Sequence, residues 1–163
     1  SECGGSAVKT RVGHSFIKAT MAETDAVFGG EHSGHFYFRD FWRADSGMLA
    51  AMHTLAALGS TPEGTTISSL LPEFERYVAS GEINTPVEDQ AAMMNLIETT
   101  FAGNDDVTTD HMDGLTVDGG QWWFNVRPSN TEPLLRLNVE AREAGRMETL
   151  RDEVLALMKG GVT

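Results

Sequence analysis

Residues 134–141 constrain the fold more than any other part of the chain, because apolar and polar side chains alternate there. Positions 135, 137 and 139 are Leu, Leu and Val, whereas positions 136, 138 and 140 are Arg, Asn and Glu. A period of two places successive side chains on opposite faces of a sheet. The run therefore predicts a half-buried strand in an antiparallel sheet that is covered on one face.

The remainder of residues 61–163 indicates a small α+β domain around this strand. Asp118, Gly119 and Gly120 separate two strand-like runs, which is a strong hairpin signal. The predicted strands cover residues 75–84, 114–117, 122–127 and 134–141, and the predicted helices cover residues 89–101 and 147–158. We expect an antiparallel sheet of about four strands with two helices packed against it.

Residues 1–60 show a different pattern, in which short strands alternate with helices. The predicted strands cover residues 6–12, 26–28 and 36–38, and the predicted helices cover residues 15–23 and 48–58. This alternation predicts an α/β domain with a mainly parallel sheet. The half is short for such a domain, so we expect part of a three-layer domain. Residues 60–65 form the candidate linker to the second half.

Composition and charge narrow the classes of function. The net charge of −12, with only 12 Lys and Arg residues, makes nucleic acid and anionic membranes poor partners. The sequence contains no apolar run of membrane-span length and no signal segment. Cys3 is the single cysteine, which agrees with a reducing cytoplasm. Because the chain does not begin with methionine, we expect a fragment of a longer protein.

The loop 127–133, Arg-Pro-Ser-Asn-Thr-Glu-Pro, concentrates groups that bind an oxyanion such as a phosphate monoester. Arg127 offers a planar fork that grips two phosphate oxygens. Ser129, Asn130 and Thr131 add short-range donors, and a turning backbone aims further N–H groups inward. The alternative interpretation is a polar hairpin turn, since Pro, Ser and Asn are common turn residues.

A second concentration of polar groups lies in the glycine-rich loop 29–35. Glu31 is suited to accept hydrogen bonds from two vicinal sugar hydroxyls, with Ser33 beside it. A glycine-rich surface turn is the first alternative. The second alternative is a metal site, although no cysteine cluster or His-Glu-x-x-His helix supports it. Its four ligands would be His14, Glu31, His32 and His35.

His14 lies at a predicted strand-to-helix junction. A helix N-terminus at this place favours a bound anion. A lone histidine is equally suited to capping or packing there, so both interpretations stay open.

Three motifs in order resemble the phosphohexomutase superfamily, the phosphomannomutase/phosphoglucomutase enzymes. They are Arg-Val-Gly-His-Ser-Phe-Ile at 11–17, Gly-Glu-His-Ser-Gly-His at 30–35 and the loop 127–133. The resemblance spans nearly the whole chain. It implies that residues 1–60 are the C-terminal part of the family's third, sugar-binding α/β domain, and that residues 61–163 are its fourth, phosphate-binding α+β domain.

The resemblance also implies roles for individual residues. The five sugar-binding residues would be Glu31, Ser33, His35, His14 and Arg11, of which the last two match positions near the active site. The residues that hold the non-transferring phosphate would be Arg127, Ser129, Asn130 and Thr131. The family reaction interconverts hexose 6-phosphate and hexose 1-phosphate through a bisphosphate intermediate, so positioning and charge neutralisation dominate its chemistry.

The sequence departs from the family pattern in two places. The phosphoserine loop with its Ser-His-Asn core and the Asp-Gly-Asp-Gly-Asp-Arg magnesium loop have no counterpart here. We therefore expect no catalytic residue and no metal in this chain. Mg²⁺, the phosphoserine and the hexose 1,6-bisphosphate intermediate would depend on missing N-terminal domains of the same polypeptide. The isolated chain would bind a hexose phosphate but would not isomerise it.

Two other functions are compatible with these residues. The first is a stand-alone module that binds sugar phosphates without catalysis. The second is a metal-dependent hydrolase built on the four metal-ligand candidates.

Overall fold

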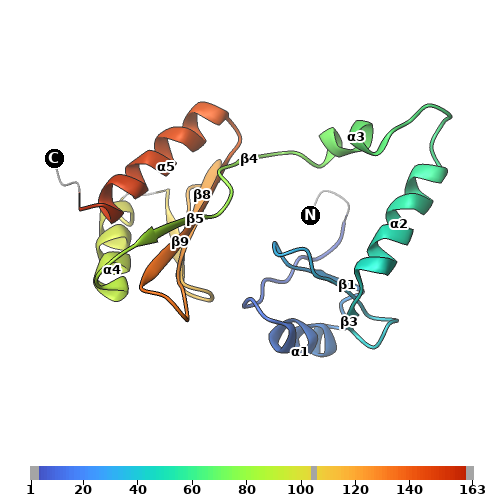
Figure 1. The fold of residues 1–163 in the computed structure, drawn as a ribbon, viewed down its shortest axis with the longest axis horizontal. Coiled ribbons are helices and arrows are strands. Elements are labelled where there is room, and N and C mark those ends of the chain that lie inside the picture. The colour runs from blue at the N-terminus through green and yellow to red at the C-terminus, as the bar shows by residue number, and fades with distance from the viewer. Residues whose placement is uncertain (1–3, 104–105, 161–163) are drawn as a thin grey trace. The chain divides into compact units, whose positions relative to one another are not determined.

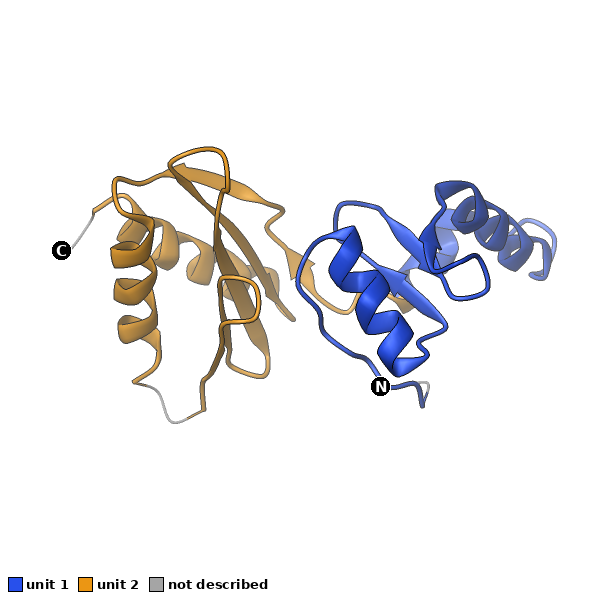
Figure 2. Ribbon diagram, turned by 90° about the horizontal axis from the view of Figure 1, so that it is seen from below, with its two compact units in different colours: residues 1–72 blue, residues 73–163 orange. Residues whose placement is uncertain are grey.

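The computed structural model describes residues 4–103 and 106–160, and the chain divides into two compact units, residues 1–72 and 73–163 (Figures 1 and 2). Each unit has its own hydrophobic cluster. The division lies between Pro72 and Glu73, whereas the sequence places the candidate linker at 60–65. Cys3, on which the expectation of a reducing compartment depends, lies outside the described residues.

The first unit has a small sheet, with one helix before it and two helices after it in the sequence. Its elements are α1 (His14–Thr24), β1 (Phe28–Gly30), β2 (Phe36–Phe38), β3 (Ala44–Asp45), α2 (Gly47–Gly59) and α3 (Ile67–Leu70). Helix α2 begins after Ser46, one residue before the predicted start at 48, and the hydroxyl of Ser46 accepts a hydrogen bond from the N–H of Leu49. The strands pair in the order β1-β2-β3. The predicted mixture of helices and strands is confirmed.

The mainly parallel sheet predicted for this unit is wrong for its described strands. Both strand pairs, β1 with β2 and β2 with β3, are antiparallel. The connection between β1 and β2 runs only from residue 31 to residue 35. A parallel pair needs a crossover of a dozen or more residues, so this short loop permits only a hairpin. The predicted strand 6–12 is irregular, because no described strand pairs with it.

The second unit is an antiparallel sheet with α4 and α5 on one face (Figures 1 and 2). A short 3₁₀ turn, η1 (Leu71–Glu73), lies at the boundary between the units. The elements that follow it are β4 (Val78–Ala79), β5 (Ile83–Pro86), α4 (Gln90–Phe101), β6 (Thr108–Asp110), β7 (Leu115–Asp118), β8 (Trp122–Pro128), β9 (Leu134–Ala141) and α5 (Ala144–Met158). The sheet order is β4-β9-β8-β7-β6, and β5 also pairs with β9.

This sheet has six strands among the described residues, where the sequence predicts about four. The predicted strand 75–84 is divided into β4 and β5, because Gly81 adopts a positive φ of 69° between them. Strand β6 forms where the sequence shows only a polar stretch. The antiparallel pairing, the two covering helices and the hairpin at 118–120 are confirmed.

Strand β9 has the two faces that its alternation predicts. Leu135 and Leu137 are fully buried in the core that α4 and α5 cover. On the opposite face, Arg136 is paired across the ladder with Arg127 of β8. The alternation therefore places two guanidinium groups side by side on the face of the sheet opposite to α4 and α5.

None of the helices in the part of the chain that the structure describes is long and apolar enough to cross a membrane.

Candidate functional site

The predicted site residues fall into two groups, one in each unit. The sugar group lies around the loop 31–35 of the first unit. The phosphate group lies around the loop between β8 and β9 of the second unit.

The loop 31–35 is a tight connection closed by backbone hydrogen bonds. The N–H of Glu31 donates to the carbonyl of His35 at 2.9 Å, and the N–H of Gly34 donates to the carbonyl of Glu31 at 3.0 Å. Gly34 has a φ of 83°, which favours glycine at this turn. The sequence thus folds locally so that Glu31 and His35 face each other across the base of the hairpin.

Glu31 is held by residues from two other elements. Its side chain is only 7% exposed. Oε1 accepts a hydrogen bond from the N–H of Gly13 at 3.0 Å, just before α1. Oε2 accepts a hydrogen bond from the hydroxyl of Tyr37 in β2 at 2.5 Å. Tyr37 was not predicted as a site residue, because it reads as one apolar position of a strand.

The environment of Glu31 favours its ionised form. Burial alone would raise the pKa of this carboxyl group. The hydrogen bonds from Tyr37 and Gly13, together with the nearby His14 and His35, outweigh burial and lower the pKa of Glu31. Glu31 is therefore a carboxylate near neutral pH, and a carboxylate accepts hydrogen bonds without donating any.

The two histidines lie beside this carboxylate. Nδ1 of His35 is 3.7 Å from Oε2 of Glu31 and 2.9 Å from the hydroxyl of Ser33. The rings of His14 and His35 meet edge to face with their centroids 4.8 Å apart. The structure therefore brings together four of the five predicted sugar-binding residues: His14, Glu31, Ser33 and His35.

Arg11 is placed differently from the other four. Its guanidinium lies over the ring of Phe16, 4.7 Å from the ring centroid. This cation–π contact holds Arg11 against α1.

Three of the four predicted metal ligands lie close together in the structure. His14, Glu31 and His35 offer ligand atoms within 4.8 Å of one another, whereas His32 is exposed and is not a member of this cluster. All three clustered side chains already have hydrogen-bonding partners in the protein. The cluster is thus satisfied as a hydrogen-bonded group, and this arrangement does not favour the hydrolase interpretation.

The loop 127–133 is built around a buried hydroxyl. Ser129 is 7% exposed, and its Oγ accepts a hydrogen bond from the N–H of Thr131 at 3.4 Å. The N–H of Ser129 donates to the carbonyl of Leu134 at 3.0 Å, which closes the loop. The side chains of Asn130 and Thr131 are exposed at its tip. Donors are therefore gathered next to Arg127 at the end of β8.

Gln90 supports this loop from outside. It is the first residue of α4, and its side-chain amide donates to the carbonyls of Glu132 at 3.2 Å and Leu134 at 2.9 Å. The amide of Gln90 thus satisfies two carbonyl oxygens of the loop. No signal in the sequence identifies this residue, because the carbonyls of Glu132 and Leu134 lie 42 and 44 positions away.

Arg127 already holds an oxyanion of the protein itself. Its Nη2 donates to Oε2 of Glu82 at 3.0 Å, and Nη1 of Arg136 donates to Oε1 of the same carboxylate at 3.3 Å. Glu82 thus neutralises two cations that the β8–β9 register places opposite each other. The sequence did not identify Glu82 or Arg136 as site residues.

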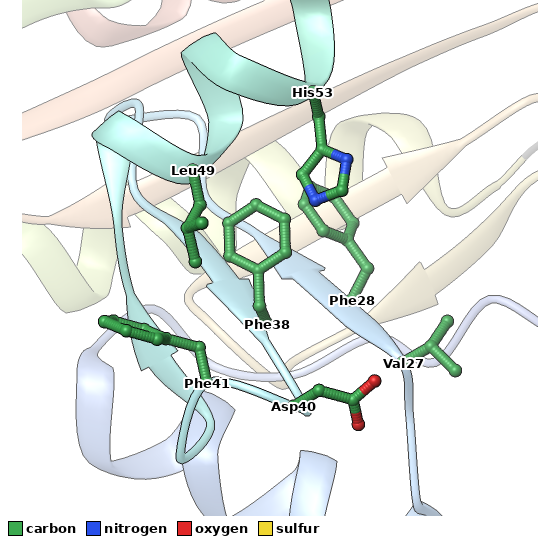
Figure 3. Close-up of a pocket in the computed structure, with 7 residues that line it drawn as sticks. All are labelled: Val27, Phe28, Phe38, Asp40, Phe41, Leu49 and His53. Carbon is green, nitrogen blue, oxygen red and sulfur yellow. The ribbon is translucent and has the colours of Figure 1, made fainter. Parts of the chain in front are cut away.

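A different feature of the first unit is an open apolar hollow, shown in Figure 3. Its lining residues are Val27, Phe28, Phe38, Asp40, Phe41, Leu49 and His53. The ring of Phe38 stacks on that of His53 with centroids 5.4 Å apart. No predicted sugar-binding residue lines the hollow, so it is separate from the sugar group.

Comparison with protein families matches almost the whole chain. Residues 1–77 match the model described as phosphoglucomutase/phosphomannomutase, alpha/beta/alpha domain III. Residues 82–157 match the model described as phosphoglucomutase/phosphomannomutase, C-terminal domain. The two models correspond in order to the two units of the structure.

Individual relatives agree with these matches. The chain is 44% identical over 155 residues to a phosphomannomutase of Methanocaldococcus jannaschii, which covers 95% of this chain and 33% of that protein. It is 42% identical over 161 residues to a protein named phosphohexose mutases of Xanthomonas campestris, covering 98% of this chain and 35% of that one. The chain therefore spans about a third of the length of these relatives.

A solved structure has a similar fold. It is a phosphoglucomutase/phosphomannomutase family protein from Burkholderia thailandensis, with a TM-score of 0.77 and 28% sequence identity. The match covers 99% of this chain and 35% of that one.

Proposed function

Because the chain belongs to the phosphoglucomutase/phosphomannomutase family and matches the models of its domain III and its C-terminal domain, we propose that it binds a hexose phosphate. The sugar hydroxyls are bound by the group around Glu31, and the phosphate is bound by the loop 127–133. The observation that carries the proposal is the contact of Arg127 with Glu82, in which the guanidinium already binds an oxyanion. A phosphate presents the same kind of acceptor oxygens to it.

The phosphate would be bound by charge and by directed donors together. Arg127 supplies the charged fork, and Asn130 and Thr131 supply exposed donors beside it. Ser129 is buried, so its hydroxyl shapes the loop and adds a donor at its base. Such a site suits the phosphate that remains on the substrate, because it binds without attacking or transferring.

The sugar would be bound chiefly through acceptors. Glu31 is ionised and held in one orientation by Gly13 and Tyr37. A carboxylate has lone pairs left after two hydrogen bonds, so it can accept from further hydroxyls. His35 and Ser33 form a hydrogen-bonded pair at the exposed edge of this group and read neighbouring hydroxyls.

The reaction of the whole protein is also part of the proposal. We infer a cytoplasmic phosphohexomutase that interconverts hexose 6-phosphate and hexose 1-phosphate through hexose 1,6-bisphosphate. The magnesium and phosphoserine loops of the family are absent from this sequence. Mg²⁺ and the transferred phosphoryl group would therefore be handled by other domains of the same polypeptide, and no step through them is assigned to residues of this chain.

A titration of the isotope-labelled chain tests the binding proposal. We expect glucose 1-phosphate and mannose 1-phosphate to shift the backbone amide signals of residues 31–35 and of residues 129–131. Inorganic phosphate is expected to shift only the second set, and glucose only the first. Absence of shifts in both loops would contradict the proposal. Conversion of either hexose phosphate by the pure chain would contradict the assignment of phosphoryl transfer to other domains.

Replacement of Glu82 with glutamine is expected to tighten phosphate binding by about two- to fivefold. The carboxylate competes with the ligand for Arg127 and Arg136, and an ion pair near the surface, such as this partly exposed one, contributes roughly 0.2–1 kcal/mol. The measurement is a calorimetric titration with inorganic phosphate at low ionic strength. Glu140→Gln makes the same charge change further along β9 and serves as the control. Weaker binding to Glu82→Gln would mean that the carboxylate orients the guanidinium groups instead of competing with phosphate.

A further inference from the structure

Tyr37 is the buried residue that connects the sugar group to the core of the first unit. Its ring is 0% exposed and packs in a cluster with Ile17 and Met21. Its hydroxyl lies 2.5 Å from Oε2 of Glu31 and 2.8 Å from Nδ1 of His14. One hydroxyl thus touches two side chains, each of which has lone pairs.

The position of the protons follows from the chemistry of these three groups. A carboxylate has no proton to give, so the proton between Tyr37 and Glu31 belongs to the tyrosine. A tyrosine hydroxyl has one proton, so it does not also donate to His14. Nδ1 of His14 must therefore carry a proton and donate it to the oxygen of Tyr37. The reverse arrangement would bring two acceptor oxygens together with no proton between them.

The charges around the cluster agree with this assignment. Oδ1 of Asp45 lies 3.8 Å from the same Nδ1, so a second carboxylate favours a proton on that nitrogen. Burial, and then the hydrogen bond and charge of Glu31 and the charge of Asp45, raise the pKa of Tyr37, which keeps its hydroxyl protonated. His35 is the other titratable group that faces His14, and its ring meets it edge to face.

We propose that Tyr37 is a positioning residue that holds His14 in the tautomer with its proton on Nδ1, so that Nε2 is the acceptor offered to the ligand. The His14 side chain is 56% exposed, and no hydrogen bond from the described residues reaches its Nε2. Only the identity of the ligand rests on the function proposed above.

This arrangement deepens that function by defining what the ligand must supply. In the tautomer with its proton on Nδ1, His14 offers a lone pair on Nε2, and ionised Glu31 offers lone pairs beside it. The ligand must therefore bring hydrogen-bond donors to two neighbouring places. Adjacent ring hydroxyls of a hexose do so, whereas the phosphate group of a monoester dianion brings only acceptors.

The tautomer of His14 is measurable directly in the free chain. We would record long-range ¹H–¹⁵N correlation spectra of the histidine rings in metal-free protein at about pH 8, above the usual histidine pKa. The expected wild-type pattern shows a protonated Nδ1 and an unprotonated Nε2 for His14. An Nε2-protonated pattern in the wild-type chain would overturn the proposal.

Two variants test the cause of that tautomer. Tyr37→Phe removes only the hydroxyl, and His14 is expected to lose its preference for the Nδ1 proton. Glu31→Gln is expected to reverse the preference and gives a reading if the first variant fails to fold. The new amide would keep its oxygen on the N–H of Gly13 and donate to Tyr37, which frees the tyrosine proton for Nδ1 of His14. An unchanged His14 pattern in either folded variant would overturn the proposal.

Tyr77→Phe is the matched control, because it removes the same hydroxyl in the second unit, where the ring lies under Arg142. It is expected to leave the pattern of His14 unchanged; a change equal to that in Tyr37→Phe would overturn the proposal.

Tyr37→Phe is also expected to weaken glucose 1-phosphate binding by about three- to tenfold and to leave inorganic phosphate binding unchanged. An equal loss for both ligands would count against the positioning role. A wild-type chain with the expected tautomer that fails to bind hexose phosphates would overturn the proposed function alone.

Discussion

Replacement of Arg127 with alanine is expected to weaken the binding of both inorganic phosphate and glucose 1-phosphate by at least about tenfold. A hydrogen bond to a charged group contributes about 1.5–3 kcal/mol, and each 1.4 kcal/mol is a factor of about ten. The side chain of Arg127 is 26% exposed, so solvent screens it only in part. Calorimetric titration of the chain with each ligand measures the effect.

Two further variants distinguish direct phosphate binding by Arg127 from a long-range effect of its positive charge. Arg151→Ala removes the same charge from α5, where the side chain is 31% exposed, and is expected to leave both affinities nearly unchanged. Arg127→Lys keeps the charge but loses the planar fork, so we expect an intermediate loss. Equal affinities of wild type and Arg127→Ala would refute direct phosphate binding by Arg127. Equal losses of affinity in Arg127→Ala and Arg151→Ala would show only a long-range effect of charge.

Replacement of Gly114 with alanine is expected to lower the free energy of unfolding of the second unit by about 2–5 kcal/mol. An added Cβ would lie 2.4 Å from the carbonyl oxygen of Val126 and 2.8 Å from Cα of Arg127, so backbone would have to move. Such overpacking costs about 1–3 kcal/mol, and a left-handed conformation adds roughly 1–2 kcal/mol for a residue with a side chain. The loss is large for a domain with a total stability of about 5–15 kcal/mol.

Gly120 provides the control for this variant. It has the same φ of 76° as Gly114, but an added Cβ there would meet nothing within 4 Å. Gly120→Ala should therefore show the conformational cost alone. Urea unfolding followed by tryptophan fluorescence measures both variants, and equal losses would show that the close approach to β8 contributes nothing. In folded Gly114→Ala we also expect weaker phosphate binding, because the displaced backbone carries Arg127.

The second unit was largely predictable because its signals are local. The alternation over 134–141 determines both faces of β9, and Asp89 caps α4 where the sequence places its start. The hairpin at 118–120 follows from glycine and aspartate at adjacent positions. The sequence predicts fewer strands for this sheet than the structure has. Gly81 divides one predicted strand into two, and the polar strand β6 has no apolar pattern that would indicate it.

The first unit shows why local signals do not specify strand pairing. Alternating strands and helices occur with parallel and antiparallel sheets alike, and the parallel prediction was wrong for its described strands. The length of the loop 31–35 was the better guide, since it is too short for a crossover. Four of the five predicted sugar-binding residues nevertheless come together, because they sit in one hairpin and at the start of one helix.

The sequence alone determined which chemical groups this chain offers and in which order: a carboxylate with two histidines, then an arginine with hydroxyls and an amide. The tertiary structure alone decided how those groups are coupled. Glu82 reaches Arg127 across 45 positions, and the Tyr37 hydroxyl joins Glu31 to His14 through a ring that reads as core. Both couplings depend on distances between residues that are separated along the chain, and no local pattern encodes such distances until the chain has folded.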